Sequence, residues 1–111
     1  MGWTSEKLAR IPEVYRDFMT VLQPVIDSRK PDVVLKMTAI PFGMIVSALS
    51  AKYPYDSEQV RAVADNLRRK GYVEEDHLGF FIPTGPGEEL IHALRQEEAV
   101  VAAGIPPLPD F

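Results

Sequence analysis

The stretch from Asp56 to Gly71 constrains the fold most, because it marks both ends of one helix. Asp56 is a favourable N-cap residue, and Gln59 stands three positions later, which is the spacing of a capping box. Gly71 can adopt the left-handed conformation that ends a helix. Apolar residues recur between these ends at helical spacing. The sequence therefore predicts an amphipathic helix with a buried stripe made of Val60, Val63, Ala64 and Leu67.

Two further helices and a strand are expected on the N-terminal side. The first helix begins near Pro12 and continues to about Lys30, with a kink at Pro24, where one backbone hydrogen bond is lost. Val33–Thr38 is rich in β-forming residues and predicts a short strand. A second helix follows Pro41, and its apolar face consists of Phe42, Ile45, Val46 and Leu49.

The C-terminal side predicts a hairpin followed by a last helix. Tyr72–Asp76 and Phe80–Pro83 read as two strands joined by the short loop His77–Gly79. Thr84–Gly87 is expected to be a turn that leads into a helix ending near Gly104. The predicted order is therefore helix, strand, helix, helix, strand, strand, helix, a mostly α fold with a small antiparallel β wing.

Length and composition predict a single domain. The chain has 111 residues, with 46% hydrophobic and 25% charged residues, and no cysteine, which excludes disulfides and thiolate metal sites. We expect the domain to span residues 12–104, between an N-terminal tail (1–11) and a Pro-rich C-terminal tail (105–111). No apolar run reaches the roughly 18 residues that a membrane span needs, so the expected location is the cytoplasm.

Two motifs between about residues 33 and 94 resemble those of one protein family. They read Val60-x-x-Val63-x-x-x-Leu67-x-x-x-Gly71-Tyr72-Val73 and Phe81-Ile82-x-Thr84-x-x-Gly87-Glu88-Glu89-Leu90. In this order and separation they resemble the MarR/PadR-like winged-helix regulators. The resemblance implies a winged helix-turn-helix fold, a third helix that enters the major groove of DNA, a wing that touches the DNA backbone, and a homodimer formed by the outer helices.

The third helix and the hairpin hold the residues expected to bind DNA. Three consecutive cations, Arg68, Arg69 and Lys70, could clamp phosphate groups. Their alternative interpretation is a favourable interaction of cations with the C-terminal end of a helix dipole. The predicted DNA-binding residues are Ser57, Arg61, Arg68, Arg69, Lys70 and His77.

Acidic residues on the same elements favour a different partner. The formal net charge is −4, and the hairpin begins with the acidic run Glu74–Asp76, which phosphate would repel. On the third helix, Asp65 is expected to pair with Arg69, and Glu58 with Arg61, as on an ordinary solvated helix face. The alternative function is therefore a non-catalytic winged-helix module that binds another protein.

Catalysis, metal binding and cofactors are not expected. Glu74, Asp76 and His77 could in principle ligate a metal, but a structural zinc site usually needs four ligands. The sequence contains no nucleophile-elbow serine, and no Gly-Lys-Ser/Thr sequence follows Gly85–Gly87 as a phosphate loop would require.

A homodimer is expected because the terminal helices have more apolar surface than one small domain can cover. A symmetric two-fold dimer is the commonest way to bury such a surface. The residues predicted to form this interface are Tyr15, Phe18, Leu22, Val100 and Val101.

Overall fold

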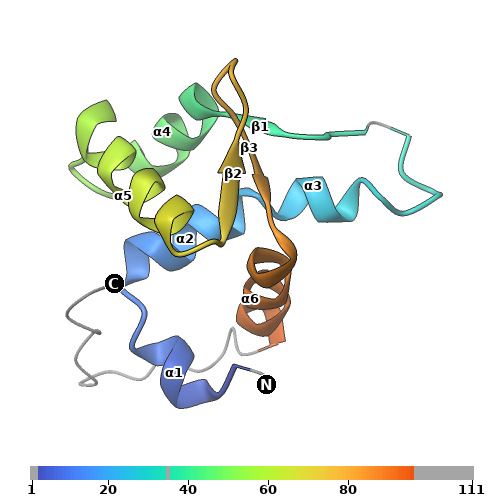
Figure 1. The fold of residues 1–111 in the computed structure, drawn as a ribbon, viewed down its shortest axis with the longest axis horizontal. Helices are drawn as coiled ribbons and strands as arrows, with labels where there is room; N and C mark the ends of the chain where they lie inside the picture. The colour runs from blue at the N-terminus through green and yellow to red at the C-terminus, as the bar shows by residue number, and fades with distance from the viewer. Residues whose placement is uncertain (1–2, 35, 97–111) are drawn as a thin grey trace.

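The computed structural model describes residues 3–34 and 36–96, and this part of the chain is mostly helical with a small three-stranded antiparallel sheet (Figure 1). The predicted order of elements is confirmed, with the first helix divided in two and a short helix added before it. The elements are α1 (Ser5–Ala9), α2 (Glu13–Val21), α3 (Gln23–Asp27), β1 (Ile40–Pro41), α4 (Phe42–Ser50), α5 (Ser57–Arg69), β2 (Val73–Glu75), β3 (Phe80–Pro83) and α6 (Gly85–Gln96).

Helix α5 forms as its sequence predicts. The Asp56 carboxylate accepts a hydrogen bond from the Gln59 backbone N–H at 2.9 Å, and the Gln59 side chain accepts one from the Asp56 N–H at 2.9 Å. Gly71 follows the helix with a φ of 84°, the left-handed conformation expected there. The predicted stripe faces the core, with all four members buried: Val60, Val63, Ala64 and Leu67.

The region before α4 differs from the prediction. Among the described residues of Val33–Thr38 none lies in a strand, and Leu35 is outside the described residues. Strand β1 is instead Ile40–Pro41, which pairs antiparallel with Phe81 and Phe80 of β3. A strand needs a partner for its backbone groups, and the central strand β3 pairs with β1 at these two positions. Val34 is 95% exposed and lies outside any strand, although valine favours β structure.

The first helix is divided near Pro24, whereas the sequence predicted one helix with a kink there. Helix α2 ends at Val21 and α3 begins at Gln23. Around the break, backbone N–H groups bond the carbonyl three residues earlier, as in a 3₁₀ turn. The Leu22 N–H donates to the Met19 carbonyl, and the Val25 N–H donates to the Leu22 carbonyl. Because proline has no N–H, it cannot bond the carbonyl four residues earlier.

Residues 5–9, assigned from the sequence to an N-terminal tail, form helix α1. The Thr4 side chain accepts a hydrogen bond from the Lys7 backbone N–H at 3.2 Å and caps this helix. Leu8 and Ile11 are 4% and 1% exposed and belong to the hydrophobic core. The tail assignment was wrong here because five residues are too few to show a clear helical period.

The expected turn Thr84–Gly87 is mostly the first turn of α6. The Thr84 hydroxyl accepts a hydrogen bond from the Gly87 N–H at 3.2 Å and donates one to the Gly71 carbonyl at 2.5 Å. Gly87 is buried where α6 crosses the residue before β2. A Cβ at this position would lie 1.9 Å from the Tyr72 carbonyl oxygen, so the crossing requires glycine.

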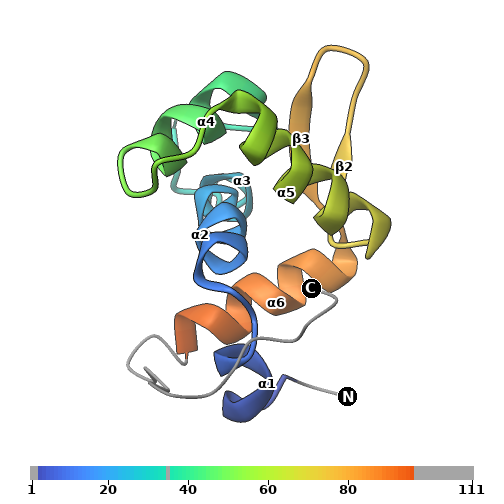
Figure 2. The same ribbon diagram turned by 90° about the vertical axis from the view of Figure 1, so that its left-hand side faces the viewer.

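Helix α2 lies at the centre of the fold. Figure 2 shows it between the α4–α5 pair and α6. Phe18 and Leu22 have no exposed surface, and the Phe18 ring packs edge-on against Phe81 of β3, with 5.8 Å between ring centroids. The hydrophobic core is therefore assembled around α2.

A polar cluster fixes the α4–α5 connection to α2. Lys52 Nζ lies 2.7 Å from Glu13 Oε1 and 2.9 Å from Asp17 Oδ2. The Tyr53 hydroxyl donates a hydrogen bond to Asp17, and burial together with this carboxylate raises the pKa of Tyr53 above its ordinary value. These contacts link the α4–α5 connection to α2.

Within residues 3–34 and 36–96, no helix has both the length and the apolar character needed to cross a bilayer.

Candidate functional site

Two arginines of α5 meet a carboxylate of the hairpin. Arg61 and Arg68 are seven residues apart, which places them two turns apart on the same flank of the helix. Arg61 Nη1 lies 2.8 Å from Glu75 Oε1, and Arg68 Nη1 lies 3.1 Å from the same oxygen. The Glu75 side chain is 12% exposed, so this carboxylate is largely enclosed. We call Arg61, Arg68 and Glu75 the arginine–carboxylate cluster.

The alternation of side chains along β2 explains why Glu75 reaches α5. Val73 is buried, Glu74 is exposed and Glu75 is half-buried, because residues two apart point to the same face of a strand. From the sequence, Glu75 was expected to be a charge that would repel phosphate. Counting from Val73 along the strand would have placed Glu75 on the inner face.

Arg61 is also held by aromatic rings. Its guanidinium carbon lies 4.1 Å from the centroid of the Phe42 ring and 5.7 Å from that of Phe81. A guanidinium within about 6 Å of a ring centroid is attracted to the ring, which adds to the ion pair with Glu75. The charge of Arg61 is therefore fixed at the junction of α4, α5 and the sheet.

The ion pairs predicted along α5 are different in the structure. Asp65, expected to pair with Arg69, instead lies 4.0 Å from Arg61 and 3.8 Å from Arg68. Arg61, expected to pair with Glu58, is bound to Glu75. For Arg61 the prediction was wrong because it compared neighbours on one helix, whereas the closest carboxylate comes from the adjacent strand. Asp65 does pair within α5, but with Arg61 and Arg68 instead of Arg69.

The remaining predicted DNA-binding residues are spread over the helix and the hairpin. Ser57 is exposed at the start of α5, and Arg69 at its end donates to Asn66 Oδ1 at 2.5 Å. The two ends are about 18 Å apart at 1.5 Å per residue. Lys70 is the C-cap residue of α5, and His77 is exposed in the loop between β2 and β3. The structure thus brings Arg61 and Arg68 together, and places Ser57 at the other end of the helix from Arg69.

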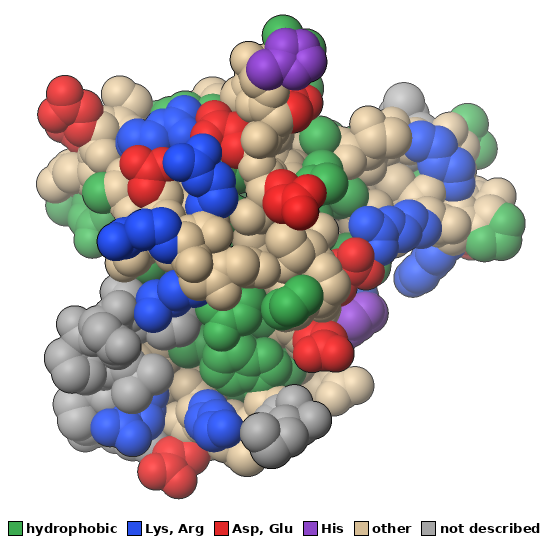
Figure 3. All heavy atoms as spheres, viewed as in Figure 1, with side chains coloured by type: hydrophobic (Ala, Val, Ile, Leu, Met, Phe, Trp, Pro, Cys, Tyr) green, Lys and Arg blue, Asp and Glu red, His purple; other side chains and the backbone are tan. Residues whose placement is uncertain are grey.

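Charges of both signs lie close together on the face that carries α5 and the hairpin. Figure 3 shows blue and red side chains intermingled over α5 and beside β2. Glu58 and Glu74 are exposed, and Asp65 is half-buried. The two arginines of the cluster therefore lie in an electrostatically mixed surface.

Asp76 stabilises the hairpin loop. Its Oδ1 atom accepts hydrogen bonds from the backbone N–H groups of Phe80 and Leu78, both at 2.9 Å. The bond from Phe80, together with that from Leu78, lowers the pKa of Asp76 below its ordinary value. Asp76, expected from the sequence to repel phosphate, thus also orders the loop that contains His77.

We expect this contact to make hairpin stability depend on pH. A lowered folded-state pKa means that the contribution is complete above the unfolded value of 3.8 and is lost as pH falls through the folded value. The wild type should therefore lose more thermal stability than Asp76→Ala in this acidic range, as measured by circular dichroism. Glu74→Ala, which removes a neighbouring exposed carboxylate, serves as the control and should follow the wild type. Parallel curves for Asp76→Ala and the wild type would contradict the assignment.

The residues considered as metal ligands do not form a metal-binding group in the structure. Within the described ranges, no set of three or more histidine, aspartate or glutamate side chains is placed to hold a metal ion. This includes Glu74, Asp76 and His77.

The predicted dimer residues lie in different environments. Phe18 and Leu22 are completely buried in the core of the single chain, so their assignment to a dimer surface was wrong. Tyr15 is half-buried, and its hydroxyl accepts a hydrogen bond from Asn66 Nδ2 at 2.7 Å. Val100 and Val101 lie outside the described residues.

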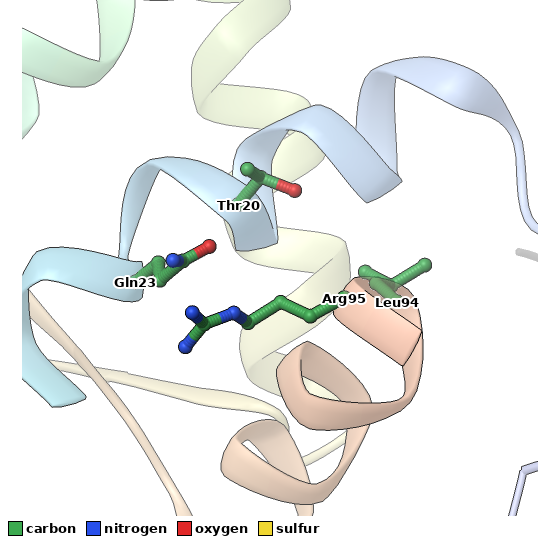
Figure 4. Close-up of a pocket in the computed structure, with 4 residues that line it drawn as sticks. All are labelled: Thr20, Gln23, Leu94 and Arg95. Carbon is green, nitrogen blue, oxygen red and sulfur yellow. The ribbon is translucent and has the colours of Figure 1, made fainter. Parts of the chain in front are cut away.

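A pocket of about 370 Å³ lies between the α2–α3 junction and α6 (Figure 4). Its polar side chains are already bonded within the protein. Arg95 Nη1 lies 3.2 Å from Asp27 Oδ1, and Gln23 Nε2 donates to Asp27 Oδ2 at 3.3 Å. The pocket is thus a polar junction that links α3 to α6, and is lined by Thr20, Gln23, Leu94 and Arg95.

Comparisons of the chain with protein-family models, with curated proteins and with solved structures found no match.

Proposed function

We propose that this chain is a winged-helix domain that binds double-stranded DNA and acts as a transcriptional regulator. In this proposal α4 and α5 are the helix-turn-helix, α5 is the recognition helix, and the β2–β3 hairpin is the wing. The observation that carries the proposal is the position of Arg61 and Arg68, which stand together on α5 at its junction with the hairpin. Two guanidinium groups at one point are suited to bind a phosphate oxygen.

The rest of α5 supports the same proposal. Its core-facing stripe is buried while Ser57 at its start and Arg69 at its end are exposed. A helix that presents an exposed face beside a hairpin has the shape needed to enter the major groove. In this arrangement Arg69 and Lys70 contact phosphates at one end of α5, and His77 approaches the DNA backbone from the hairpin loop. A two-fold homodimer would present two such helices to neighbouring grooves.

The second candidate is a module that binds another protein. It is favoured by the enclosed carboxylate of Glu75, which already pairs with both Arg61 and Arg68, and by the exposed Glu58 and Glu74 on the same elements. A surface of mixed charge complements a protein partner better than a uniformly negative phosphate backbone.

Salt dependence of DNA binding distinguishes the two candidates. Fluorescence anisotropy with a generic labelled duplex should show weak binding at low salt and a steep loss as KCl is added. Arg68→Ala and Arg69→Ala should each reduce the magnitude of the slope of log K against log [KCl] by about 0.9, since each removes about one phosphate contact.

Arg95→Ala is the matched control, because it removes the same charge from α6, where Arg95 pairs with Asp27. This variant should keep the wild-type slope. Equal losses in all three variants would indicate a general charge effect without a DNA-binding face. Absence of binding by the wild type at low salt would favour the protein-binding module.

A further inference from the structure

We propose that Arg61 and Arg68 form a phosphate-binding site and that Glu75 occupies this site as an internal anion in the free protein. The inference rests on the proposed DNA-binding function and deepens it, because it assigns the site a regulation. Glu75 thereby weakens DNA binding by competing with phosphate for the same two guanidinium groups.

The geometry of the cluster is that of an occupied oxyanion site. A single oxygen, Glu75 Oε1, receives Arg61 Nη1 at 2.8 Å and Arg68 Nη1 at 3.1 Å. Carboxylate and phosphate oxygens accept the same charge-assisted hydrogen bonds from arginine. A phosphate oxygen placed where Glu75 Oε1 lies would therefore find both donors already in position.

The two arginines differ in how tightly the fold holds them. Arg61 stacks on the Phe42 ring, and its side chain is 37% exposed. Arg68 lies at the edge of the cluster, and its side chain is 51% exposed. Arg61 is thus a fixed donor, and Arg68 can turn outward, so phosphate can reach the cluster from solvent.

Glu75 differs from its neighbour Glu74 in one useful respect. Both are on β2, but Glu75 points towards α5 whereas Glu74 is exposed on the other face of the strand. Substituting either one removes one negative charge from the hairpin. Only the substitution at Glu75 removes the carboxylate that hydrogen-bonds both arginines, whereas Asp65 stays at 4.0 and 3.8 Å from them in either variant. Comparing the two variants therefore separates local competition from long-range repulsion.

The first experiment measures binding of a generic DNA duplex to the wild type, Glu75→Gln and Glu74→Gln over a range of KCl concentrations. Glutamine keeps the shape and one acceptor oxygen but binds guanidinium more weakly, because it has no charge. Glu75→Gln should bind about tenfold more tightly at low salt, with a slope steeper by at most about 0.9, the value for the one phosphate that the two arginines share. Glu74→Gln should raise the affinity by a smaller factor and leave the slope unchanged.

The second experiment uses inorganic phosphate, so that it does not depend on DNA binding. The arginine Nε–H signals of Arg61 and Arg68 are followed by NMR during a phosphate titration. In Glu75→Gln these two signals should shift with a dissociation constant about tenfold lower than in the wild type, since the closest carboxylate, that of Glu75, no longer competes and only the more distant Asp65 remains. The signal of Arg95 is the internal control and should move little.

The outcomes separate the inference from the proposed function. Unchanged DNA slopes together with unshifted arginine signals in Glu75→Gln would overturn the phosphate site. Equal phosphate affinity in Glu75→Gln and the wild type would overturn the role of Glu75 as a competitor. Phosphate binding at Arg61 and Arg68 without DNA binding by any variant would refute DNA as the partner. It would still support a phosphate-binding site that Glu75 occupies in the free protein.

Discussion

Replacing Gly87 with alanine should destabilise the fold by at least about 3 kcal/mol, at the upper end of the range for overpacking. The added Cβ would lie 1.9 Å from the Tyr72 carbonyl oxygen and 3.3 Å from Met19 Cε. Met19 could move, but the carbonyl belongs to the backbone and accepts a hydrogen bond from the Thr84 N–H at 3.1 Å. Helix α6 would therefore have to shift away from the start of β2. Urea unfolding followed by circular dichroism measures the loss.

Gly85→Ala is the matched control for this variant. Gly85 lies in the same turn of α6, and a Cβ built there meets nothing within 4 Å. Its replacement should leave stability unchanged or raise it by about 0.4–1 kcal/mol, through lower entropy of the unfolded chain. Similar stabilities for the Gly87 and Gly85 variants would show that α6 does not cross so close to Tyr72.

The second large effect is expected for Phe18→Ala, which should cost about 3–5 kcal/mol of unfolding free energy. Phe18 is fully buried, and its ring meets Phe81 edge-on, so truncation leaves a cavity between α2 and the sheet. A loss of this size should lower the melting temperature by at least about 12 °C in a domain of this length. Phe18→Leu, which fills most of the cavity, should lose less.

Protein concentration distinguishes a core position from a dimer interface. If Phe18 contributed to a subunit contact, the loss of stability in Phe18→Ala would depend on concentration, because dimer stability follows mass action. We expect the same difference in melting temperature between variant and wild type at high and low concentration. A difference that changes with concentration would restore Phe18 to an interface.

Features that depend on nearby residues could be predicted from the sequence. The capping box of Asp56 and Gln59, the buried stripe of α5 and the left-handed Gly71 all rest on spacing within one helix. The strands of the hairpin were found for the same reason, because short alternating runs flank a loop that contains Gly79. Such interactions join residues that are close in the chain, so spacing alone reveals them.

The candidate site could be predicted in part. Arg61 and Arg68 were both predicted site residues, and their spacing of seven residues brings them to one flank of α5, where both reach Glu75. Their partner Glu75 was missed, because which carboxylate a guanidinium binds depends on how β2 lies against α5. Of the two predicted pairs, Glu58 with Arg61 was replaced by a contact across elements, to Glu75, whereas Asp65 lies near Arg61 and Arg68 of α5 and Arg69 bonds Asn66.

By itself, the sequence of this protein determined the order of its main elements and which side of α5 is apolar, because both follow from local propensity and period. Tertiary structure alone decided three other features. It limited β1 to two residues, since a strand extends only where it finds a partner. It buried Phe18 in the chain's own core. The sequence could not decide this, because an apolar helix face does not show whether the same chain or a second copy covers it. It also brought Glu75 to the arginines of α5, since ion pairs between elements form only after those elements have packed.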